Sequence, residues 1–196
     1  GMPASRWTPS GDLSACCAFL GMPALAATRT VFIGGPGAQL MPFAPLLLPQ
    51  EALLSCGPAV ARMVIASETG RLVPESELRR QSQKYPGGYD PVNGTDMSNV
   101  AILLQENGVS DVRMHDDLSI DELQAATAGG HPAVAHCVNE DGSGHFVVVD
   151  DVRDNPDGTR TVSVRDPWRP GEGDQYQMSE AEFDDYYSGG AITTNP

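Results

Sequence analysis

Positive charge is scarce in this chain. Its 196 residues include 12 Lys and Arg against 26 Asp and Glu, which gives a formal net charge of −14. Such a chain is repelled by phosphate backbones and by anionic membrane surfaces, so we expect neither nucleic acid nor a membrane as a partner. The acidity suits solubility instead, or a basic segment of a protein partner.

Cysteine is also scarce. Four residues, Cys16, Cys17, Cys56 and Cys137, do not make a disulfide framework in a chain of this length, and no Cys-x-x-Cys pair predicts a zinc site. Apolar runs are short as well, and none reaches the ~18 residues that span a bilayer. These absences favour a thiol enzyme from a reducing compartment, or one activated there, without a metal or another cofactor.

The N-terminal quarter differs in composition from the rest. Residues 1–48 are rich in Ala, Pro and Gly, and we interpret them as an extension that precedes the main domain. The stretch 13–27 has the length of a signal-peptide apolar region, although Asp12 and Pro23 interrupt that pattern. The compartment is therefore left open between the cytoplasm and secretion as an effector.

The remaining chain is organised around a cysteine that precedes an apolar helix. Within residues 59–66 the apolar side chains recur at three- and four-residue steps, which predicts a helix over 57–69 that Gly70 ends. Cys56 then lies at the helix N-terminus, where free N–H groups and a partial positive charge favour the nucleophilic thiolate. The alternative is that Cys56 is a small buried apolar filler.

Helices are predicted in the first half of the main domain and strands in the second. Capping-box spacing marks two helix starts, at Ser119 and Ser179. Besides 57–69, we predict helices over 74–82 and 95–107, one that begins at Ser119, and one from Ser179 to about Tyr187. Strands are predicted over 112–114, 133–138, 145–152, 160–165, 175–178 and 191–194. This order predicts an α+β fold, with the helical part packed on an antiparallel sheet.

A catalytic thiol needs a base and a third group that orients the base. His145 begins one predicted strand and Asp166 ends the next. In an antiparallel pair the start of one strand lies beside the end of its neighbour, so the two side chains can meet. The alternative is an edge histidine and an unrelated aspartate in a turn.

Other residues compete for these roles. Asp150 and Asp151 share a strand with His145 but lie more than about 15 Å along it. His136 and Cys137 could be drawn into a metal site with Cys56 and His145, but adjacent strand residues point to opposite faces. We therefore expect no metal.

Taken together, Gln50, Cys56, His145 and Asp166 resemble the papain-like cysteine peptidases, in particular the bacterial double-glycine (bacteriocin-leader) peptidases and the papain-fold toxin domains. The resemblance covers residues 50–194 and includes the runs CGPA and HFVVV. It implies a papain-like fold in a catalytic domain over 49–196. It also implies that Cys56 is the nucleophile, His145 its base, Asp166 the orienting acid and Gln50 an oxyanion donor.

Three functions use such a domain. The resemblance favours a peptidase, or a peptidase-like effector or toxin domain, that acts on a protein or peptide and has an immunity or inhibitor protein as a possible partner. A glutamine or asparagine deamidase or a transglutaminase is one alternative, and a non-catalytic peptide-binding module is another. Gly34–Gly35 in the extension resembles a double-glycine cleavage point, so the extension could occupy the cleft as inhibitor or substrate. It could equally be structural, with a simple glycine turn.

Overall fold

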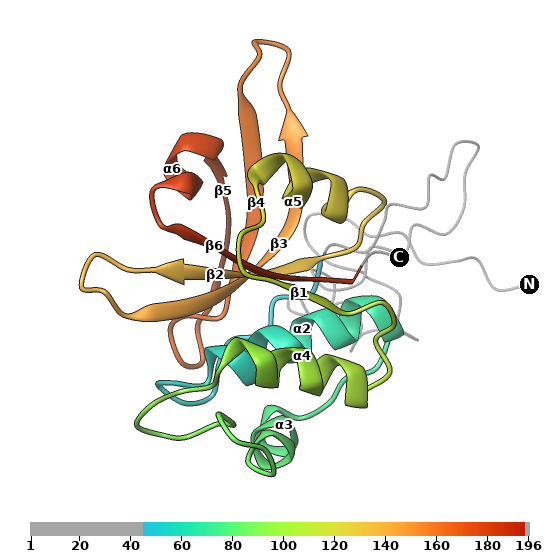
Figure 1. Cartoon of the computed structure of the whole chain (residues 1–196), viewed down its shortest axis with the longest axis vertical. Helices are drawn as coiled ribbons and strands as arrows, with labels where there is room; N and C mark the ends of the chain where they lie inside the picture. The colour runs from blue at the N-terminus through green and yellow to red at the C-terminus, as the bar shows by residue number, and fades with distance from the viewer. Residues whose placement is uncertain (1–44, 195–196) are drawn as a thin grey trace, which may run out of the picture. The chain divides into compact units, whose positions relative to one another are not determined.

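A computed structural model describes residues 45–194. The predictions made for the stretch 13–27, for Gly34–Gly35 and for the first two cysteines lie outside these residues. Residues 47–196 form one compact unit. Its centre is a six-stranded sheet in which every neighbouring pair is antiparallel, in the order β1-β6-β2-β3-β4-β5 (Figure 1). The strands are β1 (Arg113–His115), β2 (Ala133–Val138), β3 (Gly144–Asp154), β4 (Arg160–Asp166), β5 (Asp174–Ser179) and β6 (Tyr187–Thr193).

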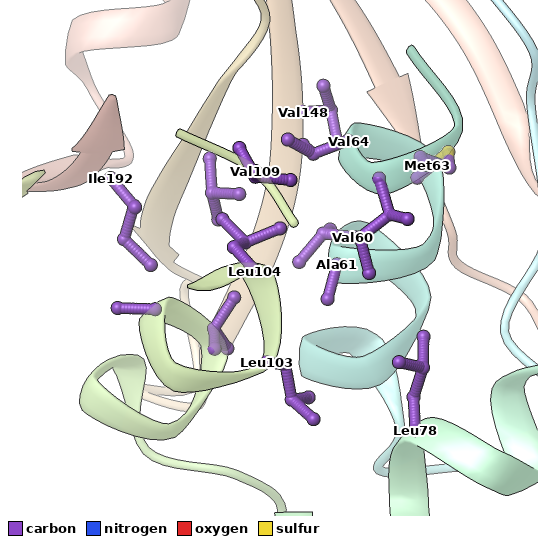
Figure 2. Close-up of a cluster of buried hydrophobic side chains, with 14 of the residues drawn as sticks. Val60, Ala61, Met63, Val64, Leu78, Leu103, Leu104, Val109, Val148 and Ile192 are labelled. Carbon is purple, nitrogen blue, oxygen red and sulfur yellow. The ribbon is translucent and has the colours of Figure 1, made fainter. Parts of the chain in front are cut away.

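Helices cover both faces of this sheet, and each face has its own apolar core. The helices are α2 (Cys56–Thr69), α3 (Glu75–Ser82), α4 (Met97–Glu106), α5 (Ile120–Thr127) and α6 (Glu180–Asp184). One core joins α2 and α4 to Val148 of β3 and Ile192 of β6, as Figure 2 shows. The other joins Leu123 of α5 and Phe183 to the opposite face of the sheet. Each such side chain contributes about 1.5–3 kcal/mol when it is fully buried, so the two cores fix the sheet between its helices.

The predicted α+β class and the order of helices and strands are confirmed. Both capping boxes are present, because Ser119 and Ser179 each accept from the N–H three residues later, and a Glu at that position bonds back. Gly70 ends α2 in the left-handed conformation, with φ 69°. Among the described residues no helix is both long and apolar enough to cross a membrane.

The C-terminal region differs from its prediction. The last helix ends at Asp184 rather than near Tyr187, and the final strand already begins at Tyr187 instead of residue 191. A Gly–Gly pair usually ends a strand pattern, but here Gly189 adopts φ 84° inside β6, where the pairing with β2 shifts register. The glycines therefore bend the strand without breaking it. In the helical part of the domain, α4 begins at Met97 rather than at residue 95.

Candidate active site

Cys56 is the first residue of α2, one position earlier than the predicted helix start. Its side chain is partly exposed, whereas the helix behind it is buried from Gly57 to Ile65 except at Arg62. Gly57 allows a close approach here, because a Cβ at this position would lie 2.9 Å from the Cβ of Thr95. The packing of α2 therefore holds the thiol at the end of a rigid helix.

His145 and Asp166 meet as their positions in the strands predicted. His145 pairs with Cys137 across β2 and β3, and Asp166 is the last residue of β4. The His145 Nε2 atom lies 2.7 Å from Asp166 Oδ1. The two side chains are 13% and 18% exposed, so solvent screens this ion pair only weakly.

The electrostatics of His145 link all three residues. Burial of the ring lowers the pKa of His145, but hydrogen bonds with Asp166 and with Cys56 outweigh burial and raise this pKa to about 9. The imidazole therefore carries its proton at neutral pH. Because Nε2 faces the carboxylate, Nδ1 is the ring nitrogen that remains for the thiol.

Two further residues hold Asp166, and the sequence analysis did not identify either. The Trp168 N–H donates to Asp166 Oδ1 over 2.8 Å, and the Tyr176 hydroxyl lies 3.4 Å from Oδ2. Burial raises the pKa of Tyr176 to about 12, so its hydroxyl stays protonated and can donate. The Trp168 ring stands edge-on to the His145 ring, with the centroids 6.3 Å apart. The contact of Trp168 with Asp166 could have been predicted, because the two residues are only two positions apart. The contact of Tyr176 with Asp166 depends on the pairing of β4 with β5.

Gln50 is fully buried beside the segment that leads to Cys56. Its backbone N–H donates to Pro167 O over 2.9 Å, which links this segment to the loop after Asp166. Its side-chain Nε2 donates to Ala52 O at 2.6 Å and to Leu53 O at 2.8 Å. Both amide hydrogens are thus engaged by carbonyl oxygens, and Oε1 is buried without a partner among the described residues. The oxyanion role of Gln50 stays a prediction.

Three of the competing residues lie in other surroundings. The Asp150 carboxylate binds the Arg165 guanidinium, with Oδ1 2.6 Å from Nη2. His136 Nδ1 lies 2.8 Å from the Ser188 hydroxyl, and Cys137 is fully buried. Burial and the nearby Asp166 charge raise the pKa of the Cys137 thiol well above its usual range. Within residues 45–194, no three His, Cys, Asp or Glu side chains are grouped so that they could hold a metal ion.

The fold is shared with solved structures. The chain is similar to the peptidase domain of Streptococcus ComA, which is described as a bi-functional ABC transporter involved in a quorum sensing pathway: the two are 22% identical over 78% of this chain and 99% of that domain, with a TM-score of 0.59. It is also similar to the peptidase domain of Streptococcus mutans ComA, at 21% identity over 76% of this chain and 98% of that one, with a TM-score of 0.53.

A plant enzyme shows the same fold at lower identity. The proform of Amb a 11, a cysteine protease and major ragweed pollen allergen, is 14% identical over 76% of this chain and 62% of its own, with a TM-score of 0.51. The fold is therefore papain-like. No curated protein matches the chain. The model of the Peptidase C39 family matches residues 47–196, which is most of the chain. The chain therefore belongs to the Peptidase C39 family of cysteine peptidases.

Proposed function

We propose that this protein cleaves a peptide bond after a Gly–Gly pair in a leader-like segment, with Cys56 as nucleophile, His145 as acid and base, and Asp166 as the residue that orients His145. One observation carries the proposal. A half-buried carboxylate lies 2.7 Å from the imidazole of His145, and hydrogen bonds with this carboxylate and with the partly exposed Cys56 thiol raise the pKa of that imidazole. Membership of the Peptidase C39 family and the resemblance to double-glycine peptidases support a leader peptide as the substrate.

The geometry suits acyl transfer. The Cys56 sulfur attacks the carbonyl carbon of the second glycine and forms a C–S bond, which leaves the negative charge on the carbonyl oxygen. The C–N bond then breaks while His145 gives its proton to the leaving amine. Water next attacks the thioester as His145 takes one of its protons, and the C–S bond breaks to release the carboxylic acid, which leaves the sulfur anion and the protonated imidazole that began the cycle.

The negative oxygen needs hydrogen-bond donors, which are typically worth about 2.7–4 kcal/mol each. The backbone N–H of Cys56 is one candidate, because the first N–H groups of a helix have no intrahelical partner. Gln50 is the second candidate of the proposal. Its amide would have to give up its bond to Ala52 O or Leu53 O in order to donate to the oxyanion.

The surroundings of the thiol support an apolar peptide segment as the ligand. Leu53 and Leu54, just before the nucleophile, and Trp168, just after the aspartate, are among the exposed large apolar side chains of the described residues. A peptide with apolar residues before its Gly–Gly pair would cover them on binding.

Activity on a short peptide tests this proposal. A peptide that ends in Gly–Gly and carries a fluorogenic amine should be cleaved by the wild-type chain, while Cys56→Ala and His145→Ala lose at least about 1,000-fold in kcat. The matched control is His131→Ala, which removes a histidine whose Nδ1 faces Glu68 instead. Ammonia release from glutamine peptides without any new N-terminus would contradict the peptidase proposal and favour a deamidase.

We further propose that residues 1–48 are an extension and 49–196 the catalytic domain. Leader processing is favoured here over the effector or toxin role that the sequence also suggested, because it follows from the family alone. Intact mass measured after incubation of the wild-type chain and of Cys56→Ala tests whether the extension is itself a substrate. Equal masses would exclude cleavage after Gly34–Gly35.

A further inference from the structure

The backbone of Gln50 is bound to the loop that follows Asp166. Its N–H donates to Pro167 O, and its carbonyl accepts from the Gly171 N–H, each over 2.9 Å. The same loop is tied to the carboxylate of the candidate site, because the Trp168 N–H donates to Asp166 Oδ1 over 2.8 Å. The backbone at residue 50 therefore has a fixed place relative to Asp166.

The residues before Gln50 pack against the same loop. A Cβ on Gly173 would lie 3.1 Å from Pro49 Cγ and 3.3 Å from Leu47 Cδ1, which is closer than side chains normally approach. The same Cβ would lie 3.2 Å from Asp166 O. The segment that ends at Gln50 is thus held close to the end of β4 by packing as well as by hydrogen bonds.

The side chain of Gln50 binds the turn that leads to Cys56. Its Nε2 donates to Ala52 O at 2.6 Å and to Leu53 O at 2.8 Å, so both amide hydrogens are used by carbonyls of this turn. Only two residues separate Leu53 from Cys56. Gln50 therefore binds the loop 167–171 through its backbone and the turn before the thiol through its side chain.

Stability alone does not explain an amide at this position. Gln50 is fully buried, and its Oε1 has no hydrogen-bond partner among the described residues. A buried acceptor without a partner destabilises a fold, whereas an apolar side chain of the same length avoids that cost. The amide is better explained by the two carbonyls that its Nε2 holds in place.

We propose that Gln50 is a positioning residue that fixes the Cys56 thiol relative to the Asp166 carboxylate, so that His145 can contact both. This inference rests on the proposed function, because these three residues carry the proposed acyl transfer. It differs from the oxyanion role of the amide, in which Gln50 would touch the substrate. Here Gln50 acts through the turn before Cys56, and its effect precedes the formation of any oxyanion.

Alkylation of Cys56 separates positioning from oxyanion binding. Iodoacetamide forms a C–S bond with the sulfur and releases iodide, so this reaction needs a thiolate but no oxyanion donor. Gln50→Met keeps the length of the side chain and removes both donors. We expect it to slow alkylation at pH 7 about 5- to 10-fold, because a thiol away from a positive charge is mostly protonated at this pH. Unchanged alkylation, with only cleavage of the Gly–Gly peptide impaired, would overturn the inference.

The dependence of alkylation on His145 is a readout that a loss of stability alone would not change. In the wild-type chain, His145→Ala should slow alkylation about 5- to 10-fold. In the Gln50→Met chain the same substitution should cost less than about twofold, because the imidazole no longer faces the sulfur. An equal factor in both chains would overturn the inference. No effect of His145→Ala on the wild-type chain would instead refute the proposed function.

Asn107→Leu is the matched control. Asn107 is also a buried amide, and its Nδ2 donates to Leu103 O over 2.8 Å and to Gln81 Oε1 over 2.9 Å, at the end of α4. This variant should lose stability in chemical denaturation and keep both alkylation and its dependence on His145. Equal slowing by Asn107→Leu would mean a general loss of structure and would overturn the inference. If Gln50→Met does not fold, Gln50→Asn keeps an amide that is too short to reach both carbonyls, and the same losses are expected.

Discussion

His145 is held in its charged form by its neighbours, and removing one of them should shift the pH range of catalysis. In Asp166→Asn the carboxylate charge is lost while burial of the ring remains, so the pKa of His145 should fall from about 9. A neutral imidazole cannot protonate the leaving amine, and the alkaline limb of kcat/KM for the Gly–Gly peptide should move down by at least about one pH unit.

The control for this prediction is Asp184→Asn, which removes an exposed carboxylate on α6. Its alkaline limb should match that of the wild type. If Asp166→Asn leaves the limb where it is, Asp166 does not set the charge of His145, and another group must orient the ring.

At the scale of single residues, the sequence predicts only part of the candidate site. Three residues of the candidate site lie at the ends of predicted elements. Cys56 precedes a helix, His145 begins a strand and Asp166 ends one, and local sequence patterns predict each of these ends. Tyr176 carries no such mark, because its contact with Asp166 depends on how β5 pairs with β4. Gln50 was found by its spacing, but its engagement with Ala52 and Leu53 depends on a turn that spacing does not describe.

At the scale of elements, the contact between α2 and α4 fixes the position of the Cys56 thiol. In Gly57→Ala the new Cβ would lie 2.9 Å from the Thr95 Cβ and 3.2 Å from a Val100 methyl, so the helices must separate. We expect a loss of about 1–3 kcal/mol in the free energy of unfolding. Because Gly57 adjoins Cys56, the proposed nucleophile, cleavage of the Gly–Gly peptide should fall as well. Chemical denaturation and kcat measure the two effects.

Gly70→Ala provides a comparison at the opposite end of the same helix. Its Cβ would meet nothing within 4 Å, but φ 69° is strained for alanine, which costs about 1 kcal/mol. The variant should therefore lose stability and keep kcat. Equal losses of kcat in both variants would show that activity follows stability rather than the position of Cys56.

The elements themselves differ in how far the sequence could define them. The run β2 to β5 is a meander of successive strands, and alternating apolar residues with Gly and Asp turns predict it directly. The place of β6 between β1 and β2 is different, since it depends on long-range pairing such as Ile192 with Val134 and with Met114. No local pattern in the sequence predicts this pairing. The Gly189–Gly190 pair favoured a strand that begins only at residue 191, whereas β6 already begins at Tyr187.

At the scale of the molecule, the candidate site lies where three separate parts of one domain meet. The thiol comes from the helical part, and the imidazole and carboxylate come from adjacent strands. Gln50 joins these parts, because its backbone bonds to Pro167 and Gly171 in the loop after β4. The segment from Leu47 to Gln50 is therefore part of the same compact unit as the candidate site, although it contains no helix or strand.

This arrangement predicts which truncations the protein tolerates. Among the described residues, both apolar cores are built from residues after 46, and Leu47 and Leu48 pack against the first of them. A chain of residues 47–196 should keep its free energy of unfolding within about 0.5 kcal/mol and its Cys56 alkylation rate within about twofold. A chain of residues 53–196 also lacks these leucines and Gln50, so it should unfold more easily and react with less dependence on His145. Alkylation that instead rises tenfold on removal of residues 1–46 would mean that the extension covers the thiol in the full chain.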